Sequence, residues 1–187
     1  MTATSRQYDA IIEGCRNIFT RKAKDYGTSW RVLRTISVVD QIFIKALRIR
    51  NIQETRQQKV ADDIASEFRG IINYGVIGMI QLDLGKPAVK DLPVETIEKW
   101  YLDKIELAKA TMSAKNHDYG EAWREMSQES FVDLILMKLM RIRQILLNDG
   151  KTLISEGIDA NYTDIINYAV FALIQLDQQG SVAAHNA

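Results

Sequence analysis

Apolar residues recur at the three- and four-residue spacing of amphipathic helices in six long segments of the chain. Segment 129–148 is apolar around most of its circumference, which is typical of a helix at the centre of a bundle. No segment alternates apolar and polar residues between turn signals, so the pattern requires no strand. We therefore predict an all-α fold with helices over residues 6–24, 36–53, 58–84, 94–116, 129–148 and 156–178.

The second half of the chain repeats the first half. The element Asp-Tyr-Gly-x-x-Trp at residues 25–30 returns 93 residues later, at residues 118–123. The segment 71–83 returns 94 residues later, at 165–177, so one residue is inserted between the two matches. Each copy therefore holds three of the six predicted helices.

The boundary between the copies is marked by the two prolines of the chain, Pro87 and Pro93. A fixed φ and a missing N–H make proline a stop signal for helices. The predicted divisions are a first repeat over 1–86, a linker over 87–93, a second repeat over 94–180 and a frayed tail over 181–187.

The second and third helices of each copy are apolar over more than one stripe and need covering on more than one side. Small residues three apart, Gly75 with Gly78 and Ala169 with Ala172, would let a neighbouring helix approach the third helix closely. The two copies should therefore pack on each other as tandem three-helix repeats in a pseudo-twofold helical bundle. Remaining apolar surface would also allow a homo-oligomer.

Charge and cysteine content limit the classes of partner and the cellular compartment that the sequence favours. Lys and Arg number 24 and Asp and Glu number 24, so the balance predicts neither a nucleic-acid backbone nor a membrane surface as the main partner. Cys15 is the single cysteine, which excludes an intramolecular disulfide. No stretch has the apolar length of a signal peptide or a spanning helix. We predict a cytoplasmic protein.

Charged residues interrupt the apolar helix 129–148 at Asp133, Lys138 and Arg141. The first repeat has the same residue types at the same spacing. Isolated buried charges are costly, so these groups must form ion pairs, reach solvent or face a polar cavity. Arg and Lys together suit phosphate recognition. Salt bridges at a solvated edge and the floor of a pocket both fit the pattern.

The last predicted helix carries acidic residues near one face, including Glu156 and Asp164. Carboxylates without His or Cys partners suit Mg²⁺ held jointly by protein and substrate phosphates. A solvated acidic face is the alternative interpretation. Gly70 stands in the first repeat where the second has Asp164, so only the second repeat offers the complete acidic set.

The Asp-Tyr-Gly-x-x-Trp element also allows two interpretations. It can be a helix stop followed by aromatic packing, with Trp30 and Trp123 in the core. Alternatively, Lys115 and the ring of Tyr119 or Trp123 lie at the mouth of a pocket, where an aromatic face could stack on a base.

Three motifs of the second repeat carry a family resemblance. Lys-x-x-Asp-Tyr-Gly at 115–120, Asp-x-x-x-x-Lys-x-x-Arg at 133–141, and the acidic helix from Glu156 to Asp-x-x-Asn-Tyr at 164–168 resemble the nucleotide modification associated domain 1 family. The resemblance covers both repeats. The acidic helix is also similar to that of the all-α, MazG-like NTP pyrophosphatases, although helix 94–116, with Glu106, lacks the Glu-Glu-x-x-Glu cluster of those enzymes.

The resemblance implies a nucleotide-binding protein of nucleotide metabolism or nucleotide modification, and extends to Mg²⁺-dependent hydrolysis of a nucleoside triphosphate. The implied metal ligands are Asp133, Glu156 and Asp164. The implied phosphate contacts are Lys115, Lys138 and Arg141, with Asp118, Asn167 and Tyr168 on the base or sugar and Tyr119 at the pocket mouth. The alternative is a non-catalytic interaction or scaffold module in which the duplicated charges are structural.

Overall fold

The computed structural model describes residues 2–59 and 63–185, with side chains as far as Gly180. These residues form six α-helices and two short 3₁₀ helices and include no strand, which confirms the all-α prediction. The elements are α1 (Ala3–Tyr26), η1 (Ser29–Val32), α2 (Thr35–Thr55), α3 (Ile64–Leu84), α4 (Val94–Tyr119), η2 (Ala122–Glu125), α5 (Gln128–Leu147) and α6 (Ile158–His185).

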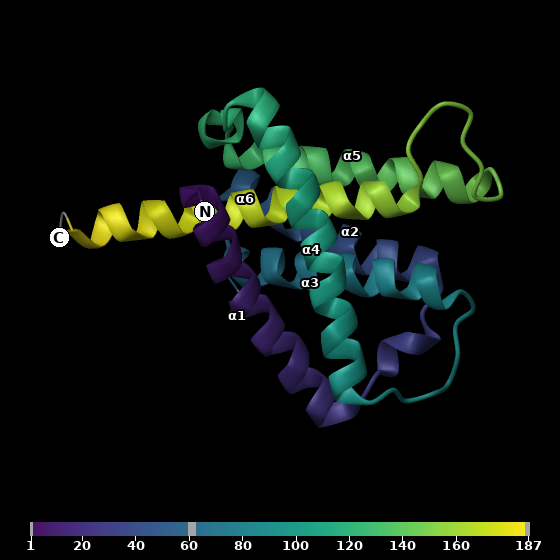
Figure 1. Cartoon of the computed structure of the whole chain (residues 1–187). Helices are drawn as coiled ribbons and strands as arrows, with labels where there is room; N and C mark the ends of the chain where they lie inside the picture. The colour runs from purple at the N-terminus through teal and green to yellow at the C-terminus, as the bar shows by residue number, and fades with distance from the viewer. Residues whose placement is uncertain (1, 60–62, 186–187) are drawn as a thin grey trace.

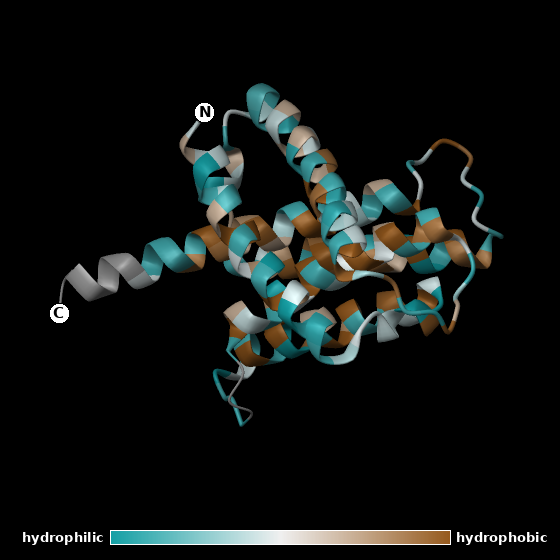
Figure 2. Cartoon of the chain, turned by 60° about the horizontal axis from the view of Figure 1, so that its bottom comes forward, coloured by the Kyte–Doolittle hydropathy of each residue, from teal (hydrophilic) through white to brown (hydrophobic). Residues whose placement is uncertain are grey.

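Helices α2, α3, α5 and α6 form a central four-helix bundle, and α1 and α4 lie across one side of it (Figure 1). Within each repeat the second and third helices pack together. Between repeats, α3 packs on α6 and α2 packs on α5. This arrangement confirms the predicted pseudo-twofold bundle. Figure 2 shows the hydrophobic residues gathered on the faces that the helices turn toward one another.

Glycine permits a close approach between the repeats, at the contact of α3 with α6. A Cβ atom on Gly78 would lie 2.6 Å from Cζ of Tyr162, and one on Gly75 would lie 2.8 Å from Cγ1 of Ile166. Real Cβ atoms do not approach other atoms this closely, so these positions accept no side chain without movement. The predicted role of the small residues is confirmed.

Polar contacts between the repeats occur in matched pairs. The Tyr8 hydroxyl donates to Oδ1 of Asn167 at 2.9 Å, and the Tyr101 hydroxyl donates to Oδ1 of Asn73 at the same distance. Each asparagine also donates from Nδ2 to the backbone of the outer helix of its own repeat. Because both tyrosines are buried, these bonds fix how each outer helix sits on the opposite repeat.

Removing either hydroxyl tests this contact. Tyr8→Phe and Tyr101→Phe should each lower the free energy of unfolding by about 1–2 kcal/mol, because each leaves a buried amide oxygen without its donor. Urea denaturation measures the change. Tyr162→Phe is the matched control, since the buried Tyr162 hydroxyl has no hydrogen-bond partner among the described residues and its removal should be neutral or stabilising. Equal effects in all three variants would contradict this account.

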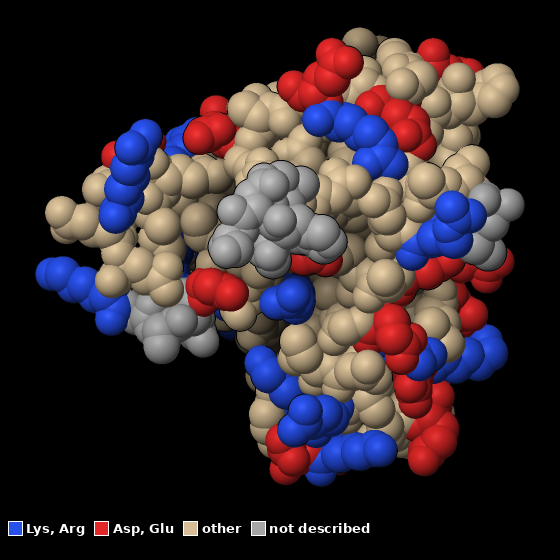
Figure 3. Space-filling model, turned by 90° about the vertical axis from the view of Figure 1, so that its left-hand side faces the viewer, with Lys and Arg blue, Asp and Glu red and all other residues tan. Residues whose placement is uncertain are grey.

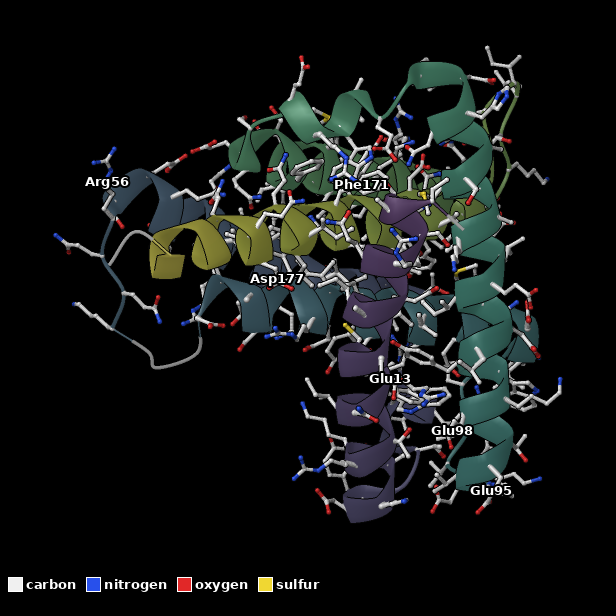
Figure 4. The ribbon with its side chains drawn as sticks, turned by 60° about the vertical axis from the view of Figure 1, so that its left-hand side comes forward. Glu13, Arg56, Glu95, Glu98, Phe171 and Asp177 are labelled. Atoms are coloured by element: carbon white, nitrogen blue, oxygen red, sulfur yellow. The ribbon has the colours of Figure 1, made fainter. Side chains whose placement is uncertain are left out.

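Helix α1 lies beside α4 (Figure 4), and Arg16, which pairs with Glu13 within α1 at 3.0 Å, also reaches Glu98 of α4 at 3.9 Å. Figure 3 shows acidic and basic side chains interspersed over one face of the molecule, in keeping with the balanced charge. None of the helices in the described ranges combines the length and the apolar character needed to cross a membrane.

Two predicted helix boundaries differ from the structure by more than three residues. Helix α3 begins at Ile64, where the Asp63 side chain accepts a hydrogen bond from the Ser66 N–H at 2.7 Å, so the predicted start at 58 was too early. Helix α6 continues to His185 and projects beyond the bundle (Figure 1), so the backbone of 181–185 in the predicted tail is helical. Residues 186–187 lie outside the described residues.

Candidate functional site

A cavity of about 720 Å³ opens in the first repeat, where α1, η1, α2 and α3 meet. Its lining combines aromatic rings, positive charges and one acid. The aromatic residues are Phe19, Tyr26, Trp30 and Tyr74. The charged residues are Lys22, Lys45, Arg69 and Glu67. The lining therefore has two more positive charges than negative ones.

The wall formed by the Asp-Tyr-Gly-x-x-Trp element is held from two sides. Gly27 ends α1 at φ 64°, a conformation that favours glycine, and a Cβ there would collide with the Asp91 carboxylate. That carboxylate accepts from the Thr28 N–H at 2.7 Å and from its hydroxyl at 2.9 Å. These hydrogen bonds lower the pKa of Asp91. The linker between the repeats thus fixes the turn beside the cavity.

Gln81 of α3 holds η1 from the other side. Its Nε2 donates to the backbone oxygen of Leu33 at 2.8 Å, and its Oε1 accepts from the Arg31 guanidinium. The second repeat has the same device, because Gln175 donates to the backbone oxygen of Met126 at 3.0 Å. Trp30, 8% exposed, is therefore held in place as a wall of the cavity.

Charge at the floor of the cavity is only partly compensated. Glu67 is buried and contacts both Lys45, at 3.1 Å, and Arg48. Lys22 and Arg69 form no ion pair among residues 2–59 and 63–185. A cavity of this kind favours an anion.

The equivalent place in the second repeat is occupied by a carboxylate. Asp164 Oδ1 lies 2.6 Å from Nζ of Lys115, and its Oδ2 lies 2.5 Å from Nζ of Lys138. Burial acts to raise the pKa of Asp164, but hydrogen bonds from the two lysines and their charges outweigh it and lower the pKa. Asp164 is thus an ionised carboxylate shared by two ammonium groups.

Other predicted site residues surround this ion-pair cluster. Tyr168 is half-buried, and its pKa is raised by burial and by the charge of Asp164, while Lys115 and Arg141 act in the opposite direction. Glu156 is exposed and favours the charged form of Lys115. The structure therefore brings together Lys115, Lys138, Arg141, Glu156, Asp164 and Tyr168.

The remaining predicted residues lie elsewhere. Asp118 lies beside His117 at the exposed end of α4, and the Tyr119 side chain is also exposed. Asn167 is buried between the repeats, where it bonds Tyr8 and the backbone oxygen of Ala108. The expected contacts of these three residues with a base or sugar stay predictions.

The three predicted metal ligands do not converge. Asp133 is exposed and pairs with Arg50 of the other repeat, and Asp164 is held by two lysines. Within the described ranges no group of three or more His, Cys, Asp or Glu side chains could hold a metal ion. The convergence that the resemblance implied is therefore corrected, because Asp133 and Asp164 each pair with different cations. Magnesium binding itself stays a prediction.

The tryptophans are packed in the core, as the first interpretation of their element predicted. Trp123 is 5% exposed and stacks on Phe171 of α6 (Figure 4), with ring centroids 4.3 Å apart. Trp30 differs, since it is buried and also lines the cavity of the first repeat.

The cavity in the first repeat was missed at the sequence level. Gly70 suggested only that the acidic set was incomplete there. The available signal was the pair Glu67 and Gly70. Gly70 corresponds to Asp164, and the acidic residue Glu67 lies about one helical turn nearer the start of α3. A Cβ on Gly70 would lie 2.9 Å from Cε of Lys45, so the missing side chain also gives Lys45 its path to Glu67.

A family model described as nucleotide modification associated domain 1 matches residues 22–82 and again residues 115–176. The two matches begin at equivalent lysines, and the first contains every cavity-lining residue except Ile18 and Phe19. No curated protein and no solved structure matches the chain significantly. Since the two matches span well over half of the 187 residues, the chain belongs to the nucleotide modification associated domain 1 family and carries two copies of its domain.

Proposed function

We propose that the first repeat binds a nucleotide in its cavity, with the phosphates near Lys22, Lys45 and Arg69 and the base against the aromatic wall. The description of the family connects the chain with nucleotide metabolism. The observation that carries the proposal is one cavity, almost all within the family match, in which Lys22 and Arg69, without an ion pair in the described part of the chain, lie with aromatic rings.

The physical properties of the cavity suit such a ligand. About 720 Å³ lies within the usual range of small-molecule sites. Lysine and arginine provide charge-assisted hydrogen bonds to phosphate oxygens. The exposed ring of Tyr26 and the fixed ring of Trp30 provide apolar faces on which a base can stack.

Hydrolysis of a triphosphate with Mg²⁺ is the more specific part of the expectation. Of the three predicted metal ligands, Asp164 already contacts Lys115 and Lys138, and Asp133 pairs with Arg50, so a phosphate-bound ion would have to displace these cations to recruit them. Nucleotide binding needs no such change. We therefore separate the two in the experiment and treat hydrolysis as a second question.

The interaction-module alternative is favoured for one set of charges. Arg50 pairs with Asp133, and Arg143 pairs with Asp40 at 2.6 Å, so these residues join α2 to α5 across the repeats. Their structural role leaves the cavity of the first repeat unexplained. A packing role for the duplicated charges of α2 and α5 is therefore compatible with a binding role for the cavity.

A nucleotide screen by thermal unfolding tests the proposal. A nucleotide at about 100 times its Kd should add roughly 2.7 kcal/mol to the free energy of unfolding. Lys22→Ala and Arg69→Ala should each weaken binding about tenfold, because each removes a charge-assisted contact. Lys24→Ala is the matched control, since Lys24 lies on the same exposed end of α1 and does not line the cavity.

The screen is run with Mg²⁺ and with EDTA. No stabilisation by mono-, di- or triphosphates at millimolar concentration, or equal losses in Lys22→Ala and Lys24→Ala, would overturn the proposal. Binding in EDTA that Mg²⁺ leaves unchanged would argue against the metal-dependent form alone. Release of phosphate or pyrophosphate from the bound nucleotide would extend binding to catalysis.

A further inference from the structure

The two repeats hold equivalent lysines around different occupants. Lys22 corresponds to Lys115 and Lys45 to Lys138, each 93 residues apart. After the one-residue insertion, Gly70 corresponds to Asp164, 94 residues apart. The two repeats therefore allow the ion pairing of the same two lysines to be compared with a carboxylate between them and without one.

In the second repeat the carboxylate satisfies both lysines. Each oxygen of Asp164 contacts one ammonium group, at 2.6 Å and 2.5 Å, and the Asp164 side chain is 7% exposed. The Lys138 side chain is 8% exposed, so its charge depends on this partner. The site is closed by a side chain of the chain itself.

In the first repeat the acidic residue stands at a different position of the helix, and the site is open. Lys45 turns to Glu67, whose counterpart in the second repeat is the uncharged Asn161. Nζ of Lys45 nevertheless stays 3.3 Å from the place where a Gly70 Cβ would lie. Lys22 lines the same cavity without an ion pair in the described part of the chain. No carboxylate stands at this position in the first repeat: the Lys45 side chain lies against Gly70, and Gly70, Lys45 and Lys22 all line the cavity.

We infer that an acidic group of the ligand, a phosphate for a nucleotide, occupies in the first repeat the place that the Asp164 carboxylate occupies in the second. Asp164 is then a built-in substitute for the ligand, and the chain binds one ligand, in the first repeat. The inference rests on the proposed function for the nature of the ligand, and it adds where the anion lies and why the second repeat is closed.

Gly70→Asp tests the position of the anion. The new carboxylate should draw Lys22 and Lys45 together as Asp164 draws their counterparts, and weaken binding of ATP and of inorganic pyrophosphate about a hundredfold. The fold should tolerate the change, because the nearest atoms belong to the flexible end of Lys45. Gly70→Asn is the matched control of nearly equal size without charge, and should weaken binding much less.

The reverse exchange tests whether the second repeat is closed by Asp164. The double variant Asn161→Glu/Asp164→Gly rebuilds the Glu67 and Gly70 arrangement in α6 and keeps an acid for Lys138. Isothermal titration with ATP should then give two sites per chain where the parent gives one. Circular dichroism confirms that the variant is folded, and Asn161→Glu alone should keep one site.

The outcomes separate this inference from the proposed function. Binding of ATP that Gly70→Asp and Gly70→Asn reduce equally would overturn the inference while nucleotide binding stands. A single site in the folded double variant would overturn it as well. Pyrophosphate that binds as tightly as ATP, and is lost in Gly70→Asp, would support the anion position and contradict recognition of a base. A parent protein that binds neither probe would overturn both.

Discussion

Gly78→Val is expected to lower the free energy of unfolding by about 3 kcal/mol or more. A Cβ at this position would lie between 2.6 and 2.9 Å from three ring carbons of Tyr162 on α6. Tyr162 is itself fully buried, so its ring has no free volume into which to move. Overpacking a dense core costs about 1–3 kcal/mol, and a branched side chain at a close approach of two helices belongs at the upper end.

Urea denaturation followed by circular dichroism measures this effect. Gly14→Ala is the matched control, because Gly14 lies inside α1 and a Cβ there meets nothing within 4 Å. That control should stabilise the protein by about 0.5–1 kcal/mol, since alanine favours the helix over glycine. A similar change in both variants would show that α3 and α6 are not in close contact.

Asp164→Ala is expected to lower the free energy of unfolding by about 3–5 kcal/mol. The change leaves Lys138 buried without its partner, and an unpaired buried charge is among the most costly defects. Lys138→Met should have a smaller effect, because Asp164 keeps its contact with Lys115. The double variant Lys138→Met/Asp164→Leu should recover most of the loss, since it buries no charge.

The pH dependence of stability tests the same cluster. Because the pKa of Asp164 is lowered in the folded state, its contribution is present above the unfolded value of about 3.9 and is lost as the pH falls through the folded pKa. The parent should therefore lose more stability than Lys138→Met/Asp164→Leu as the pH falls below about 4. Parallel curves for the two proteins would contradict the lowered pKa.

Fold and pairing were predictable because they depend on properties that repeat along the chain. Helical periodicity located all six helices, and the prolines located the linker. The apolar excess on the second and third helices of each copy predicted that these helices lie between the copies, where α2 contacts α5 and α3 contacts α6. Gly75 and Gly78 even located a close approach, since only small residues allow it.

The site was less predictable than the fold, because the spacing of charged residues along the sequence does not determine which of them form ion pairs. The family resemblance implied that Asp133 and Asp164 hold one metal ion, yet Asp133 pairs with Arg50 and Asp164 pairs with two lysines. Arg50 belongs to the other repeat, so its partner depends on how the repeats pack. The open cavity is lined by Gly70 in place of an acidic residue, and an absent side chain is not a chemical group that a motif can indicate.

The matched contacts between the repeats have a consequence for how substitutions can accumulate in such a protein during evolution. Tyr8 with Asn167 and Tyr101 with Asn73 are one contact made twice, as it would be in a dimer of two identical chains. In such a dimer any substitution enters both sites at once, and an open site next to a closed one cannot be encoded. The covalent linker removes that restraint. Each half is free to accumulate its own substitutions, and every molecule then carries the two differing halves in a fixed ratio.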